Sequence, residues 1–490
     1  MSTSPRRDGR MSWRTVLWLA GKGGRDDGTR IVLTAVGAAL GTMSLLAAAT
    51  VAAAGHGDGP YTSDLLNQPG LHPGIVIAFL LLCVPILGFV GQCSRIGAPA
   101  RDRRLAAVRM QGGTPFDVVR IAAAETGLAA VLGAALGTGA FFVLRVLLGN
   151  PVTATYRLRE QDGYTEREYT GPALRFPTDV LPPTPVLVLV VVVIPLLATF
   201  FAVYALRGVT FSPFGVVHRE QHRPSRFMAL LLFAGGTLAL ASFSTVVDAL
   251  GLDDGAAAGI GLLFLVLFLV TGIGLLMSTT ALAAAIGRLL VRFGERPSLL
   301  IAGRRLLASP SQSARTNAAL LLVVLLWAFT QGFGANLLAG VERDEALFRT
   351  NGSFYRGALA LVDLGFAVGA LITAAGLLVG CVESVLTRRR MLASLAAVGV
   401  PRSVLARATV IESMAPLVPA VLAATAAGIF AARGALGTTV GNNGAEFEVG
   451  VPWGGLAAAS FGTLLVVLLL ILLTLPLLRR STDPAELRAE

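Results

Sequence analysis

The stretch RDRRLAAVRMQGGTPFDVVRIAAAE at residues 101–125 decides the architecture, because it recurs in altered form as RRRMLASLAAVGVPRSVLARATVIE at residues 388–412. A constant offset of 287 residues aligns the two stretches without a gap. The aligned polar or special pairs are Arg101–Arg388, Arg103–Arg390, Gly112–Gly399, Arg120–Arg407 and Glu125–Glu412. Each stretch follows one apolar run and leads into another, so the pattern indicates an internal duplication.

The apolar runs around these stretches predict an all-α polytopic membrane protein. Of the 490 residues, 54% are hydrophobic and only 14% are charged, against about 25% in soluble domains. This excludes a soluble enzyme, a disordered chain and a disulfide scaffold. A membrane-spanning helix needs about 20 apolar residues. Ten runs qualify, at 31–54, 74–93, 118–148, 185–206, 227–250, 256–286, 317–338, 357–382, 406–432 and 452–478.

The distribution of Lys and Arg orients these spans. The net charge is +11, and 31 of the 40 basic residues lie on the side of the N-terminus when the ten spans are threaded alternately. Positive residues concentrate on the cytoplasmic side, so we expect both termini in the cytoplasm. The basic character is therefore a topology signal, and a nucleic acid partner is not needed to explain it.

The two halves are six spans apart, so they have the same orientation and are related by an axis along the membrane normal. This gives two parallel four-helix repeats joined by two linking helices. The expected segments are a cytoplasmic N-terminal segment with a juxtamembrane helix at 1–30, a first repeat at 31–206, a linker with two transmembrane helices at 207–298, a second repeat at 299–478 and a cytoplasmic tail at 479–490.

Two local patterns refine this plan. Asp162-Gly163 lies between alternating runs in the longest outer loop and predicts a small extracellular β-hairpin near 152–170. Glycines spaced four residues apart predict close helix packing. These pairs are Gly37 and Gly41, Gly133 and Gly137, Gly365 and Gly369, and Gly376 and Gly380.

Each repeated stretch predicts a short basic helix, rigidly joined to the next span. Leu105 and Val108, or Leu392 and Leu395, fall on one side of it at a spacing of three. Gly112 or Gly399 then ends the helix. In the first half, Thr114 caps the next helix, with Pro115 at its first position and Asp117 in its first turn. Such a cytoplasmic knob either docks on a soluble partner or lies solvated on the membrane surface.

Three carboxylates lie within the predicted spans: Glu125, Glu412 and Asp363. A charge there is expensive, so each is a functional candidate by default. For Glu125 and Glu412 we favour a structural role near the inner interface, in which each is tied to a neighbouring span. For Asp363, in the outer part of its span, proton coupling or substrate contact stays open.

Other catalytic and metal motifs are missing. Lys22 is the only lysine, and Val16 stands where a Walker motif needs its first glycine, so any ATP use must come from another polypeptide. His218 and His222 are four residues apart, but Glu220 does not complete a zinc-protease motif. We therefore expect that the chain is not itself an enzyme and holds no cofactor.

At the repeated stretches, the sequence resembles the FtsX-like (MacB-type) permease family of ABC transporters. The family pattern is an Arg run, then Leu-Ala before a glycine, and a Glu in the following span. The stretches from Arg103 to Glu125 and from Arg389 to Glu412 are similar to it. Two features depart from it: Arg104 and Met391 replace the Glu that usually follows the Arg run, and neither half has the usual large extracellular domain.

The resemblance implies partners and a site. Two copies of a separate ABC ATPase, which bind ATP and Mg, are expected below one permease chain that supplies both halves within the lipid bilayer. The ATPase-docking residues would be Arg101, Arg103, Arg104, Leu105, Val108 and Gly112 in the first half, and Arg388, Arg389, Arg390, Leu392, Leu395 and Gly399 in the second. The location implied is a bacterial cytoplasmic membrane, consistent with the Ala, Gly and Arg bias.

The resulting hypothesis is a permease that couples ATP hydrolysis to export or extraction of an amphiphilic substrate, such as an antimicrobial peptide, a drug or a lipid. One alternative is a cargo-free signalling or regulatory ABC complex. Another is an ion-coupled secondary transporter that uses the three carboxylates, although the parallel repeat argues against it.

Overall fold

The computed structural model describes most of the chain and divides it into two compact units, Met1–Arg219 and Glu220–Glu490. The described residues are 11–21, 25–56, 59–67, 72–93, 107–108, 110–159, 166–210, 226–249, 257–343, 345–387, 389–442 and 445–481. Within them the chain is almost entirely helical, as the long apolar runs predict.

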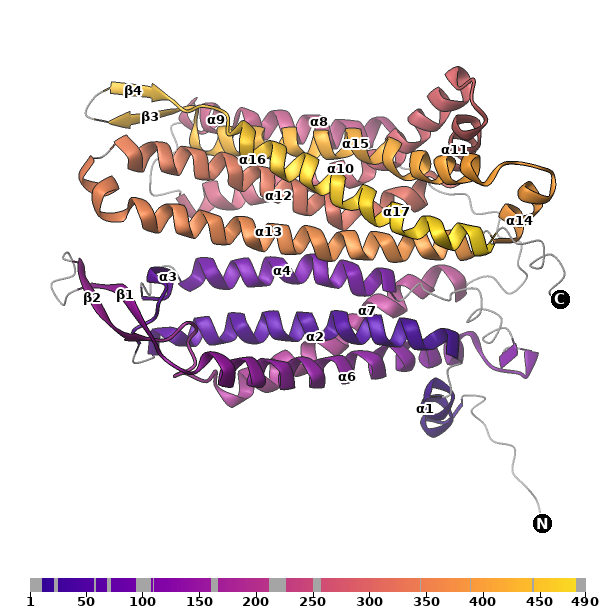
Figure 1. Ribbon diagram of the computed structural model, residues 1–490, viewed down its shortest axis with the longest axis horizontal. Coiled ribbons are helices and arrows are strands. Elements are labelled where there is room, and N and C mark those ends of the chain that lie inside the picture. The colour runs from indigo at the N-terminus through magenta and orange to yellow at the C-terminus, as the bar shows by residue number, and fades with distance from the viewer. Residues whose placement is uncertain are drawn as a thin grey trace, which may run out of the picture. The chain divides into compact units, whose positions relative to one another are not determined.

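The first unit is a helix bundle with a β-hairpin at one end and the short helix α1 at the other (Figure 1). Its helices and strands are α1 (Trp13–Gly21), α2 (Arg25–Ala53), η1 (Ala54–His56), α3 (Asp64–Asn67), α4 (His72–Cys93), α6 (Pro115–Leu148), β1 (Val152–Arg159), β2 (Glu166–Ala173) and α7 (Thr184–Thr210). Helix α2 packs against α4, α6 and α7, and α6 packs against α7.

Small residues let α2 and α6 approach closely. A Cβ atom added to Gly133 would meet the Ala35 carbonyl oxygen, and one added to Gly137 would lie 2.5 Å from the Ala39 carbonyl oxygen. The predicted close contact at this pair of glycines is therefore confirmed. Gly365 differs, because nothing lies within 4 Å of an added Cβ, so the prediction of close packing is wrong there.

The second unit contains the remaining helices, with β3 and β4 at one end and α14 at the other (Figure 1). Its elements are α8 (Arg226–Ala241), α9 (Phe243–Ala249), α10 (Ala257–Phe293), α11 (Pro297–Ala308), α12 (Pro310–Arg343), α13 (Glu345–Thr387), α14 (Arg389–Ala397), α15 (Arg402–Leu436), β3 (Thr439–Asn442), β4 (Ala445–Glu448), α16 (Trp453–Ala457), η4 (Ala458–Gly462) and α17 (Thr463–Ser481).

Helix α15 lies at the centre of this unit. Its buried residues Leu417, Val421 and Ala424 join side chains from α10, α12, α13 and α17 in one apolar core. Helices α8 and α10, predicted as linking spans, both pack against α15. Gly434 on α15 permits this contact, because an added Cβ would meet the backbone of α8 at Leu240. The linking helices are thus part of the second unit's core.

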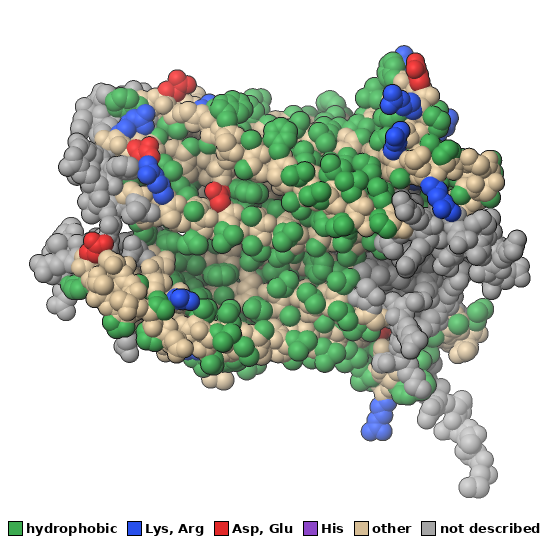
Figure 2. All heavy atoms as spheres, in the orientation of Figure 1, with side chains coloured by type: hydrophobic (Ala, Val, Ile, Leu, Met, Phe, Trp, Pro, Cys, Tyr) green, Lys and Arg blue, Asp and Glu red, His purple; other side chains and the backbone are tan. Residues whose placement is uncertain are grey.

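The helices indicate a multi-pass membrane protein. Seven of those described are long and apolar enough to cross a membrane, and three shorter apolar helices lie at 78–90, 184–200 and 227–241. On the face drawn in Figure 2, hydrophobic side chains cover the middle of the helices, and most charged ones lie toward the helix ends. Such a band of exposed hydrophobic side chains is suited to contact with the hydrocarbon interior of a bilayer.

Two predicted spans are not continuous α-helices. The run 227–250, predicted as one span, is divided at Ser242 into α8 and α9. In the run 452–478, the π-helical turn η4 separates α16 from α17. Such a turn shifts the helix face by inserting one extra residue into the hydrogen-bond ladder. Apolar periodicity carries no signal for either interruption.

Two hairpins extend from the helices. Strands β1 and β2 pair antiparallel with Tyr156 opposite Tyr169, and these two rings stack. This confirms the hairpin predicted near 152–170. Strands β3 and β4 form a second, shorter hairpin that the sequence pattern does not predict. It follows α15 in the second unit as the first hairpin follows α6 in the first.

We expect Gly133→Val to destabilise the first unit by about 1–3 kcal/mol, because the new side chain overpacks the contact with the α2 backbone. Thermal unfolding of the purified protein in mild detergent measures this. Gly139→Val is the matched control on the same helix, since nothing lies within 4 Å of its added Cβ. Equal midpoints for the two variants would contradict the close α2–α6 contact.

Candidate functional site

A short helix capped by a glycine joins α13 to α15 in the second unit. Helix α14 ends at Gly399, whose φ of 95° is a conformation that favours glycine. The Val400 N–H donates to the Leu395 carbonyl at 3.1 Å, and the Gly399 N–H donates to the Ala396 carbonyl at 3.0 Å. This is the Schellman arrangement, which satisfies the last carbonyls of a helix.

The first unit repeats this turn at the positions that the offset of 287 residues predicts. Gly112 has a φ of 92°, and the Gly113 N–H donates to the Val108 carbonyl at 3.0 Å. The Gln111 N–H donates to the Ala107 carbonyl, as the Val398 N–H does to Ser394. The predicted helix-ending role of both glycines is therefore confirmed by geometry in each unit separately.

Apolar side chains fix each of these knobs to its own unit. In the second unit, buried Leu392 and Leu405 pack with Leu395 and with Ile301 of α11. In the first unit, Val108 packs with Val118 of α6 and with α1 residues. Val108 corresponds to Leu395, and Val118 to Leu405, at the same offset. Leu392, Leu395 and Val108, predicted to dock an ATPase, thus face the helices of their own unit.

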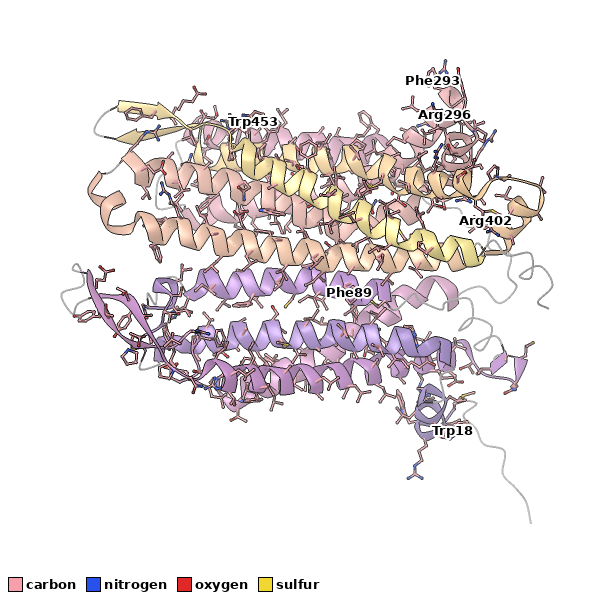
Figure 3. The ribbon with its side chains drawn as sticks, viewed as in Figure 1. Trp18, Phe89, Phe293, Arg296, Arg402 and Trp453 are labelled. Carbon is pink, nitrogen blue, oxygen red and sulfur yellow. The ribbon has the colours of Figure 1, made fainter. Side chains whose placement is uncertain are left out.

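Other residues form the outward tips. Met110 is 83% exposed and Val398 is 84% exposed, each one or two residues before the capping glycine. Arg402, the first residue of α15, is also exposed and lies next to the α14 end in Figure 3. Each tip therefore presents an apolar side chain beside basic sequence, which suits a groove on a protein partner.

Several predicted docking residues cannot be placed. Arg101, Arg103, Arg104, Leu105 and Arg388 lie outside the described residues. Arg389 and Arg390 are the first two residues of α14, but the described side chains of that helix begin after them. Their contact with an ATPase stays a prediction.

The first predicted carboxylate, Glu125, forms a buried ion pair. Arg30 Nη2 on α2 donates to Glu125 Oε2 on α6 at 2.8 Å. The two side chains are only 3% and 1% exposed. This agrees with the interpretation of Glu125 as a charge tied to a neighbouring helix. In low dielectric such a pair is held firmly once formed, because separating it leaves two uncompensated charges.

Glu412 also pairs with an arginine, but more loosely. Arg305 Nη1 on α11 donates to Glu412 Oε2 on α15 at 3.4 Å, and the side chains are 10% and 18% exposed. The two glutamates are equivalent at the offset of 287, whereas the arginines are not. Arg30 lies on the helix after the juxtamembrane helix α1, and Arg305 lies within α11 itself.

Asp363 has a different environment. Trp327 Nε1 donates to Asp363 Oδ1 at 2.8 Å, and Gln331 Nε2 donates to the same oxygen. Both donors come from α12, so the carboxylate of α13 is held by neutral N–H groups. The Trp327 ring stacks on Phe366, with centroids 6.4 Å apart. Among the described residues, no Lys or Arg forms an ion pair with Asp363.

An N-terminal clamp holds α1 on α6. Thr114 caps α6 in a reciprocal capping box with Asp117, and Pro115 is the first helical residue, as predicted. Asp117 Oδ1 accepts the Met11 N–H at 3.1 Å, and Arg120 Nη1 donates to the Met11 carbonyl at 3.0 Å. The Arg120 guanidinium also lies 4.0 Å from the Trp13 ring centroid. These contacts join α1 to the base of the first knob.

Sequence reasoning missed the partners of all three carboxylates. Arg30 lies in the second turn of α2 and Arg305 lies within α11. The need of a carboxylate inside a membrane for a positive partner is the signal that could have found them. Trp327 and Gln331 carry no such sequence signal, because a neutral donor can bond to many acceptors and does not indicate a carboxylate partner. Among the described residues, no group of three or more His, Cys, Asp or Glu could hold a metal ion.

Comparison with known protein families agrees with this arrangement. Residues 364–482 match the family model described as FtsX-like permease C-terminal, a segment that contains Gly399, Glu412 and most of α13. No curated protein and no solved structure gives a significant match. The match is confined to this segment, which is therefore similar to the C-terminal domain of FtsX-like ABC permeases. Permeases of this family generally work with ABC ATPase subunits.

We expect Glu125→Gln to lower the free energy of unfolding by about 3–5 kcal/mol, because it removes the charge that compensates Arg30 in a buried pair. Glu412→Gln should cost clearly less, since that pair is longer and more exposed. Thermal unfolding in mild detergent compares the two. Replacing both partners, as Arg30→Met with Glu125→Leu, should recover most of the loss, and no recovery would contradict the ion-pair explanation.

Gly399→Ala should cost about 1 kcal/mol, because alanine is strained at the positive φ that ends α14. No described atom lies within 4 Å of the added Cβ, so the penalty is attributed to the backbone conformation. Gly357→Ala on α13 is the control, since its Cβ is equally unobstructed and its backbone is helical. A stability change no greater than that of the control, measured by thermal unfolding, would be inconsistent with the positive-φ cap.

Proposed function

We propose that this protein is the membrane-spanning permease subunit of an ABC transporter, in which a single chain supplies both halves and two copies of a separate ATPase bind below it. ATP and Mg are bound by the ATPase, not by this chain. The family match supports the permease assignment. The observation that carries the proposal is the pair of knobs with equivalent glycine caps, because two identical ATPase subunits need two equivalent docking elements.

The packing of each knob against its own unit supports a role in transmitting force. In the second unit, Leu392 on α14 and Leu405 on α15 share one buried cluster, so α14 moves with the base of α15. Helix α15 is then the core helix of that unit, in contact with α10, α12 and α17. A displacement of the tip at Val398 therefore reaches the centre of the bundle. This is the mechanotransmission that we propose for ATP-driven movement of the two knobs.

The proposed topology places both knobs in the cytoplasm of a bacterium. The asymmetric distribution of basic residues supports this orientation. The equivalent glycine caps, apolar clusters and glutamates of the two units support a duplication that gives parallel halves. The equivalent order of long helix and hairpin in both units, α6 before β1 and α15 before β3, is a further argument for it.

The substrate that we propose is amphiphilic and leaves through the membrane by export or extraction. The short outer segments, without a large extracellular domain, offer little surface for a soluble adaptor. An ion-coupled secondary transporter is disfavoured by the Glu125 and Glu412 contacts, since each of these carboxylates is engaged by an arginine. A cargo-free signalling complex would have the same ATPase but no flux.

The test is capture of the tagged protein from its native membrane in mild detergent, with mass spectrometry of the proteins retained. We expect an ABC ATPase at about two copies per chain, because each of the two knobs docks one subunit. Met110→Asp together with Val398→Asp should reduce its capture at least tenfold, since a charge at each tip opposes burial in a partner.

Leu181→Asp is the matched control, an exposed leucine outside the knobs that precedes α7. All three substitutions are at exposed positions, so the unfolding midpoint should stay close to that of the wild type. Capture of no ATPase by the folded wild-type protein would overturn the proposal. Equal capture by the double variant would refute docking through the tips.

A further inference from the structure

Asp363 is the one carboxylate of the three predicted ones that no arginine compensates within the described residues. It lies in the apolar segment 354–382, nine residues from its start, which is about 13 Å along the helix. Trp327 and Gln331 donate hydrogen bonds to it but leave its negative charge in place. A charge at this depth is expensive and marks a functional site unless the fold requires it.

The fold of the first unit shows that such a helix pair forms without a carboxylate. There α2 packs against α4, and Gly37 of α2 admits Phe89 and Val90 of α4. Helix α4 contains no Asp, Glu, Lys or Arg. The α12–α13 pair holds the equivalent place in the second unit under the proposed duplication. The packing of this pair therefore does not explain Asp363.

The neighbours of Asp363 hold its carboxylate in place within a largely apolar surface. Gln331 reaches the carboxylate while its side chain lies against Gly455 of α16, where an added Cβ would collide with it. Trp327 is fixed by its stacking on Phe366. On the same helix as Asp363, Leu361 and Leu364 are exposed. An anionic group held beside aromatic and aliphatic surface is complementary to a cation that carries an apolar tail.

We propose that Asp363 binds the cationic head group of an amphiphilic substrate, with Trp327 and Gln331 orienting the carboxylate. The head group supplies a positive charge that no described Lys or Arg supplies, and the apolar tail lies along the exposed face of α13. The assignment rests on the proposed function for its biological meaning, because it names the substrate class of that permease.

The binding test uses the full chain in lipid nanodiscs, with Trp13, Trp18 and Trp453 replaced by Phe so that Trp327 is the only remaining tryptophan. Dodecyltrimethylammonium is the probe, and dodecyl maltoside is the uncharged probe with the same tail. We expect the cationic probe to change the Trp327 emission saturably and the uncharged one to bind at least tenfold more weakly.

Asp363→Asn should weaken binding of the cationic probe at least tenfold, since it removes the charge and keeps the Oδ1 acceptor for both donors. Glu342→Gln is the matched control, because Glu342 is a carboxylate of the same helix pair in an exposed ion pair with Arg356. Saturable binding that is equal in Asp363→Asn and wild type, or no saturable binding at all, would overturn the assignment.

If the unfolding midpoint of Asp363→Asn falls by more than about 5 °C, Gly455→Ala replaces it as the test variant, because it displaces Gln331 from the carboxylate. Unchanged binding in that variant would overturn the proposal. Capture of the ATPase is measured on the same samples and should be normal in Asp363→Asn. Probe binding without any ATPase would refute the transporter and leave the cation site standing.

Discussion

The cost of an ionised side chain away from water is the constraint on which the arrangement of both units depends. A carboxylate away from water needs a compensating charge or strong donors, and the three predicted within the spans have different partners. Glu125 pairs with a buried arginine on an adjacent helix, and Glu412 pairs with an arginine at a longer distance that is more exposed to solvent. In the described part of the chain, Asp363 has only neutral donors. All three tie neighbouring helices together, but only Glu125 and Glu412 do so through a positive charge from a described residue.

Rigid joints connect these charges to the surface knobs. Glu412 lies less than three turns after Leu405 on α15, so the cluster that fixes α14 and the ion pair that fixes α11 act on the same helix segment. In the first unit, Val118 and Glu125 have the same relation on α6. In each unit, the helix that follows the knob is thus held by an apolar contact and a charged one within the same segment.

The sequence predicts the local features of this fold better than their partners. Gly112 and Gly399 are predictable helix ends because a glycine after an amphipathic turn has a direct conformational cause, and the hairpin after α6 follows from Asp162-Gly163 in the same way. The arginines opposite the glutamates, the break at Ser242 and the π-helical turn η4 depend on tertiary packing, which leaves no periodic trace. The packing of Leu392 against its own unit was not predicted for the same reason. The spacing of apolar residues defines a helix face, but not which element packs against that face.

The different origins of the two arginines have a consequence for symmetry. Arg30 belongs to a long apolar helix, so in the first unit the glutamate is tethered to another element of the bundle. Arg305 belongs to α11, so in the second unit the contact runs to a short helix of 12 residues. Under the proposed pairing with two identical ATPase subunits, equal displacements of the knobs would act on a tightly held glutamate in one unit and a loosely held one in the other. A chain that encodes both halves can give each half different contacts, whereas two copies of one gene product carry the same contacts in each half.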